Sequence, residues 1–437
     1  MVKRLAVFAF GVAIGVVVWL GMRPQTPEGQ PSPAVSALSV EARASATPSI
    51  AADGRVVSIA WGGTSSSGAA DVFAAVSTDG GRSFAPPVRV NDEEGTARVS
   101  GEMAPRVAVR AREGQPAVVH VLWTAQGDDT TIRLARSEDG GRTYGPSQGL
   151  QAAGAAGDRG WAGLAADRDG RVRAVWLDHR GMAAGATATG VRLTADTAHH
   201  HGHDTAGSNP PSDEGVEIAL KSVIYYSDGM VERALAQGVC YCCKTAVVTG
   251  GDGQVFIAWR HVYPGNMRDI AVASSRNDGV TFSAPVRVSQ DQWQIDGCPD
   301  DGPAMALGMD ATVHLVWPTV VSQPEPHKAM FYATSRDGLR FTPRVRVSPV
   351  GHNIAHPQIA VGVDGQVVVV WDQIVQGKRR VFLSRLRDGA FAEGETLSED
   401  ASASYPVAAF SDGALVVVWT EGTPEASRIA IRRIARR

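Results

Sequence analysis

The chain lacks a large excess of charge, a chain-wide set of cysteines and the common nucleotide-binding signatures. Its 42 basic and 45 acidic residues leave a net charge of −3, which gives no electrostatic reason to expect a nucleic-acid partner. All four cysteines lie between Cys240 and Cys298, so they are a local feature and not a disulfide framework for the whole chain. The sequence contains no phosphate-binding loop, nucleotide fingerprint or haem-attachment motif.

Aromatic residues are also scarce, whereas glycine and proline are plentiful. Aromatics make up 6% of the chain, against 48 glycines and 24 prolines. This balance is typical of short strands joined by many tight turns. The length of 437 residues suits two or three ordinary domains or one large repeat fold, and an internal repeat decides between the two.

The N-terminal segment resembles an export signal in its composition. Lys3 and Arg4 precede an apolar run of 18 residues from Leu5 to Met22, which is long for a signal-peptide core and short for a membrane span. No A-x-A cleavage site follows directly, and no cysteine is present there to carry a lipid. The sequence predicts a signal anchor over residues 1–23, with a cleaved signal peptide as the alternative. Because basic residues precede the run, the rest of the chain is expected outside the cytoplasm, in the periplasm or at the cell surface.

A strand-like run that ends in tryptophan recurs seven times. Each run is rich in β-branched residues and has about the length of one sheet strand. Seven copies indicate one supersecondary unit that is repeated, and not several unrelated domains. The runs are VVSIAW to Trp61, VVHVLW to Trp123, RVRAVW to Trp176, QVFIAW to Trp259, TVHLVW to Trp317, QVVVVW to Trp371 and ALVVVW to Trp419.

A second motif follows six of the tryptophans. In it, Asp and Gly make a tight turn with positive φ, Ser and Asp side chains bond the turn backbone, and an aromatic residue returns to the sheet. The copies are STDGGRSF (77–84), SEDGGRTY (137–144), SRNDGVTF (275–282) and SRDGLRF (335–341), with weaker versions YYSDG (225–229) and SRLRDGAF (384–391). These residues resemble the Asp box, or BNR repeat, of the sialidase-like propellers, and the resemblance covers nearly all of residues 45–437.

The repeats predict an all-β fold, a β-propeller of four-stranded blades over residues 45–437. We expect seven blades, with six as the alternative, whereas the sialidases that the repeats resemble have six-bladed rings. The last unit, residues 405–437, supplies three strands, and its free edge would invite aggregation. The segment VSALSVEA (35–42) is placed to pair with that edge and close the ring with strands from both termini. Residues 24–44, rich in Pro, Ser and Ala, are expected to form a linker and this closing strand.

Soft metal ligands concentrate on one face of the predicted ring. Because strands alternate in direction, the loops that enter the innermost strands share a face, while the Asp boxes lie on the opposite face and are expected to be structural. The first face receives the run Cys-Tyr-Cys-Cys at 240–243. The candidate metal ligands are Cys240, Cys242, Cys243, Cys298, His352, His356 and Met103.

A long insertion in the third unit adds four histidines to that face. Residues 182–215 contain HHHGHD among Gly, Ala, Thr, Ser and Pro, a composition that cannot bury a core. Two interpretations stay open, a solvated loop and a metal-capturing arm, since neutral imidazoles bind copper, zinc and nickel. The histidines are His199, His200, His201 and His203.

The cysteines have three possible roles. They form disulfides, which an oxidising exterior favours, they bind a soft ion such as Cu(I), or they cycle between dithiol and disulfide. Zinc is less suitable than copper, because we do not interpret the run Cys-Tyr-Cys-Cys as the C-x₂-C knuckle of a structural zinc site, and it has no second knuckle to pair with. The leading prediction is a soft-metal site, with copper as the ion, or a thiol redox site at the mouth of the channel.

Two other functions stay open, and with them the question whether the protein is an enzyme. A sialidase-like exo-glycosidase needs an arginine cluster for a carboxylate, a Tyr–Glu nucleophile pair and a proton donor. The Arg-Ile-Pro signature of that family is missing before the first Asp box, where the chain has TPSIAADG (47–54). The second alternative is a non-catalytic propeller that binds a protein or glycan. The residues considered for a glycosidase site are Arg106, Arg159, Arg180, Arg260, Glu102 and Tyr405.

Overall fold

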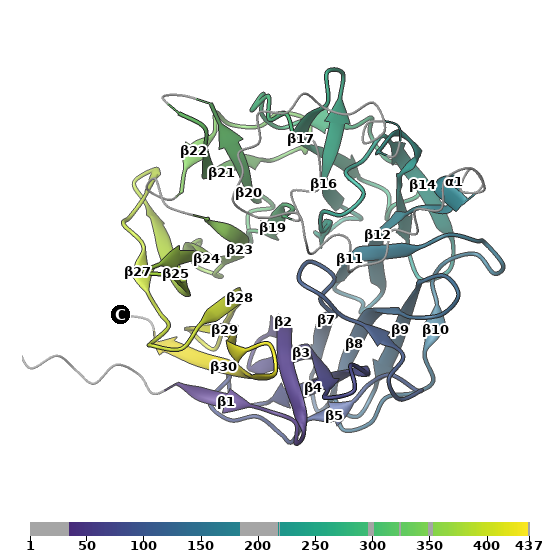
Figure 1. The fold of residues 1–437 in the computed structure, drawn as a ribbon, viewed down its shortest axis with the longest axis vertical. Coiled ribbons are helices and arrows are strands. Elements are labelled where there is room, and N and C mark those ends of the chain that lie inside the picture. Colours follow the sequence, from purple (N-terminus) through teal and green to yellow (C-terminus); the bar gives the residue numbers. More distant parts are fainter. Residues whose placement is uncertain are drawn as a thin grey trace, which may run out of the picture. The chain divides into compact units, whose positions relative to one another are not determined.

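Seven antiparallel sheets within the described residues, five of four strands and two of five, form a ring of blades (Figure 1). The computed structural model describes residues 35–183, 217, 219–295, 301–322, 325–347 and 353–435. The first blade runs outward from β2 (Arg43–Asp53) through β3 (Val56–Ser65) and β4 (Ala70–Ser77) to β5 (Val88–Arg89). The fold is the predicted seven-bladed β-propeller, so the alternative of six blades is wrong.

The other blades repeat this order from the channel to the rim. The second blade contains β7 (Arg106–Arg112), β8 (Gln115–Ala125), β9 (Thr131–Ser137) and β10 (Gln148–Gly149), and β6 (Ala97–Arg98) also pairs with β8. The third contains β11 (Arg159–Ala166), β12 (Val172–Asp178), β13 (Val223–Ser227) and β14 (Glu232–Gln237). The fourth contains β15 (Ala246–Thr249), β16 (Val255–Tyr263), β17 (Met267–Ser275) and β18 (Val286–Arg287). The fifth blade contains β19 (Ala304–Leu307), β20 (Val313–Val321), β21 (His327–Ser335) and β22 (Val345–Arg346). The sixth contains β23 (Ala355–Val361), β24 (Val367–Val375), β25 (Lys378–Arg387) and β26 (Ala390–Phe391), and β27 (Glu395–Thr396) also pairs with β25. A short helix, α1 (Arg180–Ala183), follows β12.

The seventh blade is completed by the N-terminal strand. It contains β28 (Ala403–Ser411), β29 (Ala414–Thr423) and β30 (Ala426–Ala435), and β1 (Ser36–Leu38) pairs antiparallel with β30 at its outer edge. The predicted closure of the ring by strands from both termini is therefore confirmed. The pairing covers the edge that three strands alone would leave open.

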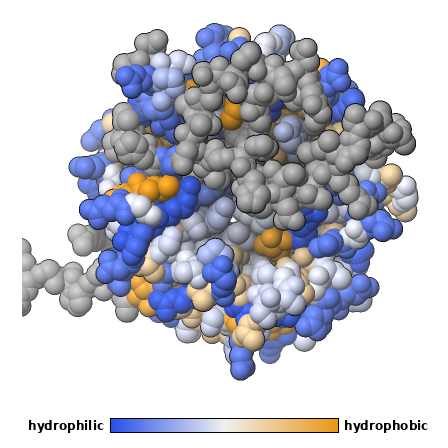
Figure 2. All heavy atoms as spheres, in the orientation of Figure 1, coloured by the Kyte–Doolittle hydropathy of each residue, from blue (hydrophilic) through white to orange (hydrophobic). Residues whose placement is uncertain are grey.

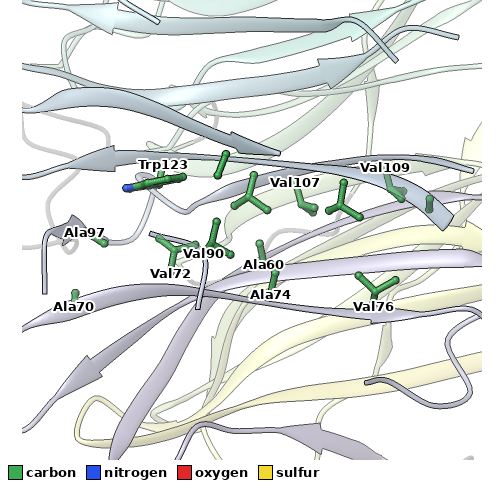
Figure 3. Close-up of a cluster of buried hydrophobic side chains, with 14 residues drawn as sticks. Ala60, Ala70, Val72, Ala74, Val76, Val90, Ala97, Val107, Val109 and Trp123 are labelled. Carbon is green, nitrogen blue, oxygen red and sulfur yellow. The ribbon is translucent and has the colours of Figure 1, made fainter. Parts of the chain in front are cut away.

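The second strand of each blade is buried on both of its faces, which explains its unbroken run of apolar residues. The seven repeated tryptophans are each at most 3% exposed. Between the first two blades, Val72, Ala74 and Val76 of β4 face Val107 of β7 and Trp123 of β8 (Figure 3). Replacing one of these tryptophans by alanine would lower the free energy of unfolding by about 3–5 kcal/mol.

The Asp boxes use their polar groups to hold the turn itself. In the first box, Asp79 Oδ1 accepts hydrogen bonds from the backbone N–H groups of Arg82 and Ser83 at 2.9 and 3.0 Å. Ser77 Oγ accepts from the N–H of Gly81 at 2.9 Å. Gly81 has φ 80°, and a Cβ there would lie 2.7 Å from Val416 of the seventh blade. These side chains are engaged locally, which supports a structural role.

Four innermost strands are entered through a bulge at the same position. Thr47, Trp161, His356 and Tyr405 have positive φ of 53–54°, and a register shift spans each of them. Side chains of this size seldom adopt such a conformation, and bulges of this kind re-aim the side chain that they carry. Three of these residues, Thr47, His356 and Tyr405, line one pocket at the channel mouth.

No helix in the described part of the chain is both long and apolar enough to cross a membrane. The apolar run at 5–22, on which the predicted signal anchor depends, lies outside the described residues. Hydrophilic side chains cover much of the visible rim of the propeller (Figure 2). The location of the protein outside the cytoplasm therefore stays a prediction.

Replacing Asp79 by alanine should destabilise the fold without changing the cysteine chemistry. The change leaves the N–H groups of Arg82 and Ser83 without their acceptor, so we expect the free energy of unfolding to fall by about 1–2 kcal/mol. Denaturant unfolding measures it. Asp400→Ala is the control, because that side chain is fully exposed and its contact with Arg380 is 3.8 Å long. Equal effects of the two changes would contradict the structural role of the Asp box.

Candidate thiol site and channel mouth

Three cysteine sulfurs gather in the loop that leads into β15. Cys240, Cys242 and Cys243 are each 1–2% exposed and pack against Trp161 and Tyr241. The Sγ atom of Cys240 lies 2.9 Å from that of Cys243 and 3.9 Å from that of Cys242. All three sulfurs lie within 4.8 Å of one another, which makes them the one group of potential metal ligands of this kind in the described residues.

The three sulfurs differ in oxidation state. Cys242 is disulfide-bonded, whereas Cys240 and Cys243 are free. The two free cysteines have the C-x-x-C spacing, so the interpretation that the Cys-Tyr-Cys-Cys run lacks this spacing is wrong. The loop thus holds a dithiol beside one sulfur of a disulfide.

Two buried arginines stabilise negative charge on Cys240. Arg268 of β17 donates from Nη1 to Cys240 Sγ at 3.6 Å, and Arg260 of β16 accepts a hydrogen bond at its carbonyl from the Cys240 N–H at 2.9 Å. Burial alone would raise the pKa of Cys240, but the hydrogen bond from Cys243 and the charges of Arg268 and Arg260 lower it to about 6. Burial and the neighbouring Cys240 sulfur raise the pKa of Cys243. Cys240 is therefore the thiolate of the pair, and Cys243 is the thiol that donates to it.

Of the remaining predicted metal ligands, Met103 and His356 lie within the described residues. Met103 is buried, and its sulfur lies 2.9 Å from the point that a Cβ on Gly160 would occupy. His356 is held by Asp372 and is not a member of the sulfur group. The residues outside the described ranges are Cys298, His352, His199, His200, His201 and His203.

A buried ion-pair network begins at the residue after Cys243. Lys244 Nζ donates to Glu102 Oε1 at 3.3 Å and lies 3.9 Å from Asp301 Oδ1. The other oxygen of Glu102 accepts from the Gly302 N–H at 3.1 Å. These residues come from three different blades, so the network joins them at the channel mouth.

A histidine–carboxylate pair stands beside that network. His356 Nδ1 lies 2.7 Å from Asp372 Oδ2, which also accepts from the Tyr405 N–H at 2.8 Å. The His356 and Tyr405 rings stack with centroids 4.0 Å apart. Burial alone would lower the pKa of His356, but Asp372, together with Asp301 and Glu102, raises it above its ordinary value. The imidazolium form is thus stabilised in the folded protein.

Three of the four arginines considered for a sialidase site are committed to internal partners. Arg159 and Arg180 both pair with Asp178, at 3.1 and 2.8 Å. Arg260 donates to the carbonyl oxygens of Asp301, Arg268 and Pro318. Arg106 is the one of the four that lines the pocket at the channel mouth.

Sequence reasoning missed Arg268 and Asp372 as functional neighbours. Both sit inside strands, Arg268 in MRDIAVASS of β17 and Asp372 in VVVVWDQIV of β24. A charged residue within an otherwise apolar strand was the available signal, because such a residue is buried only with a partner. The sequence gives no means of naming that partner.

Comparisons with known proteins show the fold and nothing finer. No family model and no curated protein match the chain. A Dyadobacter fermentans DSM 18053 protein of unknown function is 13% identical, with 92% of this chain and 98% of that chain covered and a TM-score of 0.50. An ulvan lyase of polysaccharide lyase family PL25, bound to -[GlcA(1-4)Rha3S]-, is 10% identical, with 92% and 94% covered and a TM-score of 0.53. A Hadza microbial sialidase is 15% identical, with 84% and 73% covered and a TM-score of 0.43.

The fold is therefore one that a polysaccharide lyase also uses. Membership of the Asp-box family stays a prediction, because no family model matches the chain. Fold likeness at this level does not transfer an activity. The function has to be argued from the thiol loop and the channel mouth.

The His356–Asp372 pair predicts a defined pH dependence of stability. Because the folded-state pKa of His356 is raised, its contribution is complete below the unfolded pKa of about 6.5 and is lost as pH rises through the folded pKa. We expect His356→Gln to be most destabilising below pH of about 6.5 and to converge with the unmodified protein at higher pH. Denaturant unfolding across this range, with His327→Gln of β21 as control, measures the effect. A pH-independent difference would contradict the ion pair.

Proposed function

We propose that this propeller is an extracytoplasmic thiol–disulfide redox protein whose reactive pair is Cys240 and Cys243. The observation that carries the proposal is the contact between two free sulfurs, 2.9 Å apart, beside the disulfide-bonded Cys242. Arg268 supplies the positive charge that a reactive thiolate requires.

The reaction that this geometry supports is an exchange of two electrons. The Cys240 thiolate attacks one sulfur of an external disulfide, which leaves a mixed disulfide and one released thiolate. Cys243 then loses its proton and attacks the Cys240 sulfur, which forms the Cys240–Cys243 disulfide and releases the second thiolate. The cysteine pair is oxidised and the external disulfide is reduced to one thiol and one thiolate, because the single proton of Cys243 passes to one of the two released sulfurs.

Burial points to a small exchange partner. Cys240 and Cys243 are each about 1% exposed, which favours a low-molecular-weight disulfide over a folded protein. Because Cys242 is disulfide-bonded, its sulfur supplies no thiolate to a metal ion. This favours the redox proposal over a resident metal site.

Copper binding is a second candidate because the three sulfurs lie within 4.8 Å of one another. Soft thiolates select Cu(I), and two of them bound to it would leave one negative charge for Arg268 and Arg260 to offset. This site would hold the ion through Cys240 and Cys243, with Cys242 available only after its disulfide is reduced. The glycosidase alternative and a non-catalytic glycan-binding role rest on the fold alone.

A thiol count joined to a redox titration tests the redox proposal. In the full-length protein purified without oxygen, two of the four cysteines should react as thiols after unfolding, and four after reduction. Equilibration in thiol–disulfide buffers should show one two-electron transition that the Cys240→Ser/Cys243→Ser double variant lacks. Metal analysis of the same sample separates the candidates, because about one copper per chain with blocked thiols would favour the metal site. Four cysteines that are all bonded and resist reduction would overturn both.

Arg268 should set the acidity of Cys240. We expect Arg268→Gln to raise the pKa of Cys240 from about 6 by at least about one unit, or ~1.4 kcal/mol, because it removes the guanidinium that contacts the sulfur. Arg268→Lys keeps the charge and should restore part of the shift. The ultraviolet absorbance of the thiolate as a function of pH measures it. Arg276→Gln, an exposed change at the Asp box after β17, is the control, and an equal shift there would contradict the assignment.

A further inference from the structure

The exposed apolar side chains of the propeller gather on its Asp-box face. This face carries the turn between the first and second strands of each blade and the turn between the third and fourth, whereas the channel mouth lies on the other face. Among the described residues, six of the seven exposed large apolar side chains lie in these turns, and Leu220 lies on the channel-mouth side. The six are 46–90% exposed and are Met230, Val231, Val280, Met309, Leu339 and Val363.

The six side chains come from four neighbouring blades. The third blade supplies two of them, the fourth one, the fifth two and the sixth one. Contacts between innermost strands join these blades in order around the ring, from β11 through β15 and β19 to β23 (Figure 1). The apolar side chains therefore follow one arc of the Asp-box face, which we call the apolar arc.

The Asp boxes do not require apolar residues at these positions. Val280 and Leu339 stand where the first two boxes have Arg82 and Arg142. The backbone N–H of Arg82 and that of Leu339 each donate to the aspartate of their own box, at 2.9 and 2.8 Å, so the turn uses the backbone at this position and not the side chain. Large apolar side chains that gather on one face without a role in the fold indicate contact with a partner.

The turns between the first and second strands show the same freedom. Met309 and Val363 occupy one equivalent position, each directly after a glycine whose N–H closes the turn on a carbonyl oxygen. The matching turns of the fourth and third blades have Gly251 and Arg168 at this position. Met309 is nevertheless 71% exposed and Val363 82% exposed. The apolar choice in the fifth and sixth blades is therefore not made by the geometry of the turn.

The N-terminal part of the chain enters the propeller from the same face. β30 begins after the hairpin turn at Thr423, on the channel-mouth side, and runs toward the Asp-box face. Because β1 pairs antiparallel with β30, Ser36 lies nearer to the Asp-box face than Leu38 does. Twelve residues separate the apolar run that ends at Met22 from Val35, and a chain of this length reaches at most about 40 Å. A membrane anchor in that run would therefore favour the approach of this face to the bilayer.

We propose that the Asp-box face docks on a lipid bilayer, with the side chains of the apolar arc inserted at the boundary between headgroups and acyl chains. A bilayer fits because it is flat enough to meet turns of four blades at once, and because it is expected on the side from which the chain enters. Arg336 and Arg340, whose side chains are 77% and 90% exposed, flank Leu339 and are placed to pair with lipid phosphates. The docking rests on the predicted anchor and is independent of the thiol chemistry.

Tryptophan fluorescence of the full-length protein in lipid vesicles tests the docking. The vesicles contain phosphatidylcholine and phosphatidylglycerol, with or without bromine on the acyl chains, because brominated chains quench a tryptophan that contacts them. Met309→Trp and Val363→Trp place the reporter in the apolar arc. Leu220→Trp is the matched control, since it replaces an exposed apolar side chain on the opposite face. The unmodified protein supplies the background of the ten native tryptophans.

We expect the tryptophans added at Met309 and Val363 to be quenched at least about twofold more strongly than the one added at Leu220, because only the first two reach the acyl chains. Equal quenching at the three positions, or no quenching beyond the background, would overturn the proposal.

A polar substitution checks the same contact without adding an aromatic ring. Residues 35–437 form one compact unit that contains every strand of the ring, so this fragment is suitable without the apolar run. The double variant Met309→Ser/Val363→Ser should weaken its binding to the unbrominated vesicles at least about tenfold, whereas Leu220→Ser should leave it unchanged. An equal loss in Leu220→Ser would contradict the docking. Self-association of the fragment that the double variant abolishes would assign the face to a second copy of the chain and would also overturn it.

Discussion

Ring closure by the pairing of β1 with β30 is the constraint on which both sites depend. Only in a closed ring do the entries to all the innermost strands point at one axis, and the Cys240–Cys243 loop and the bulges at His356 and Tyr405 are such entries. The buried second strands hold each blade against its neighbour, so packing between the blades fixes the positions of the residues near the axis. Side chains from blades far apart in sequence, such as Glu102 and Lys244, can therefore be paired while buried.

Most of the fold was predictable from the sequence, because the repeated tryptophan runs and the missing fourth strand of the last unit are patterns along the chain. The shared face of the cysteines and of His356 followed from strand alternation alone. The finer chemistry was not predictable. That Cys242 is bonded while Cys240 and Cys243 are free depends on distances of a few ångströms between sulfurs. The pairing of Arg268 with Cys240 joins residues 28 positions apart, and no periodicity reports such a contact. Arg106 could be listed from sequence, but its hydrogen bonds to the carbonyl oxygens of Ala162 and Glu102 could not.

Asp301 links the two sites through different atoms. Its backbone N–H donates to the Cys243 sulfur, its carbonyl oxygen accepts from Arg260, and its carboxylate accepts from the His356 N–H at 3.1 Å. It also stands 3.9 Å from Lys244. A change of bonding at Cys243 would therefore alter the position of a residue that helps to orient the pocket wall. The thiol loop and the pocket have separate chemistry but share one rigid support.

The origin of β1 has a consequence for biosynthesis. Residues 36–38 are synthesised long before their partners in β30, Ile429 to Ile431. The β1 strand therefore has no native partner until β30 has been made, and blades that form before then do so in an open arc. Such an arc exposes the edge that the finished molecule hides, which makes the interval before closure the time when the chain is most prone to associate with other copies of itself. A protein closed in this way benefits from rapid completion of its last blade, or from a chaperone that binds the open strand edge until β30 has been made.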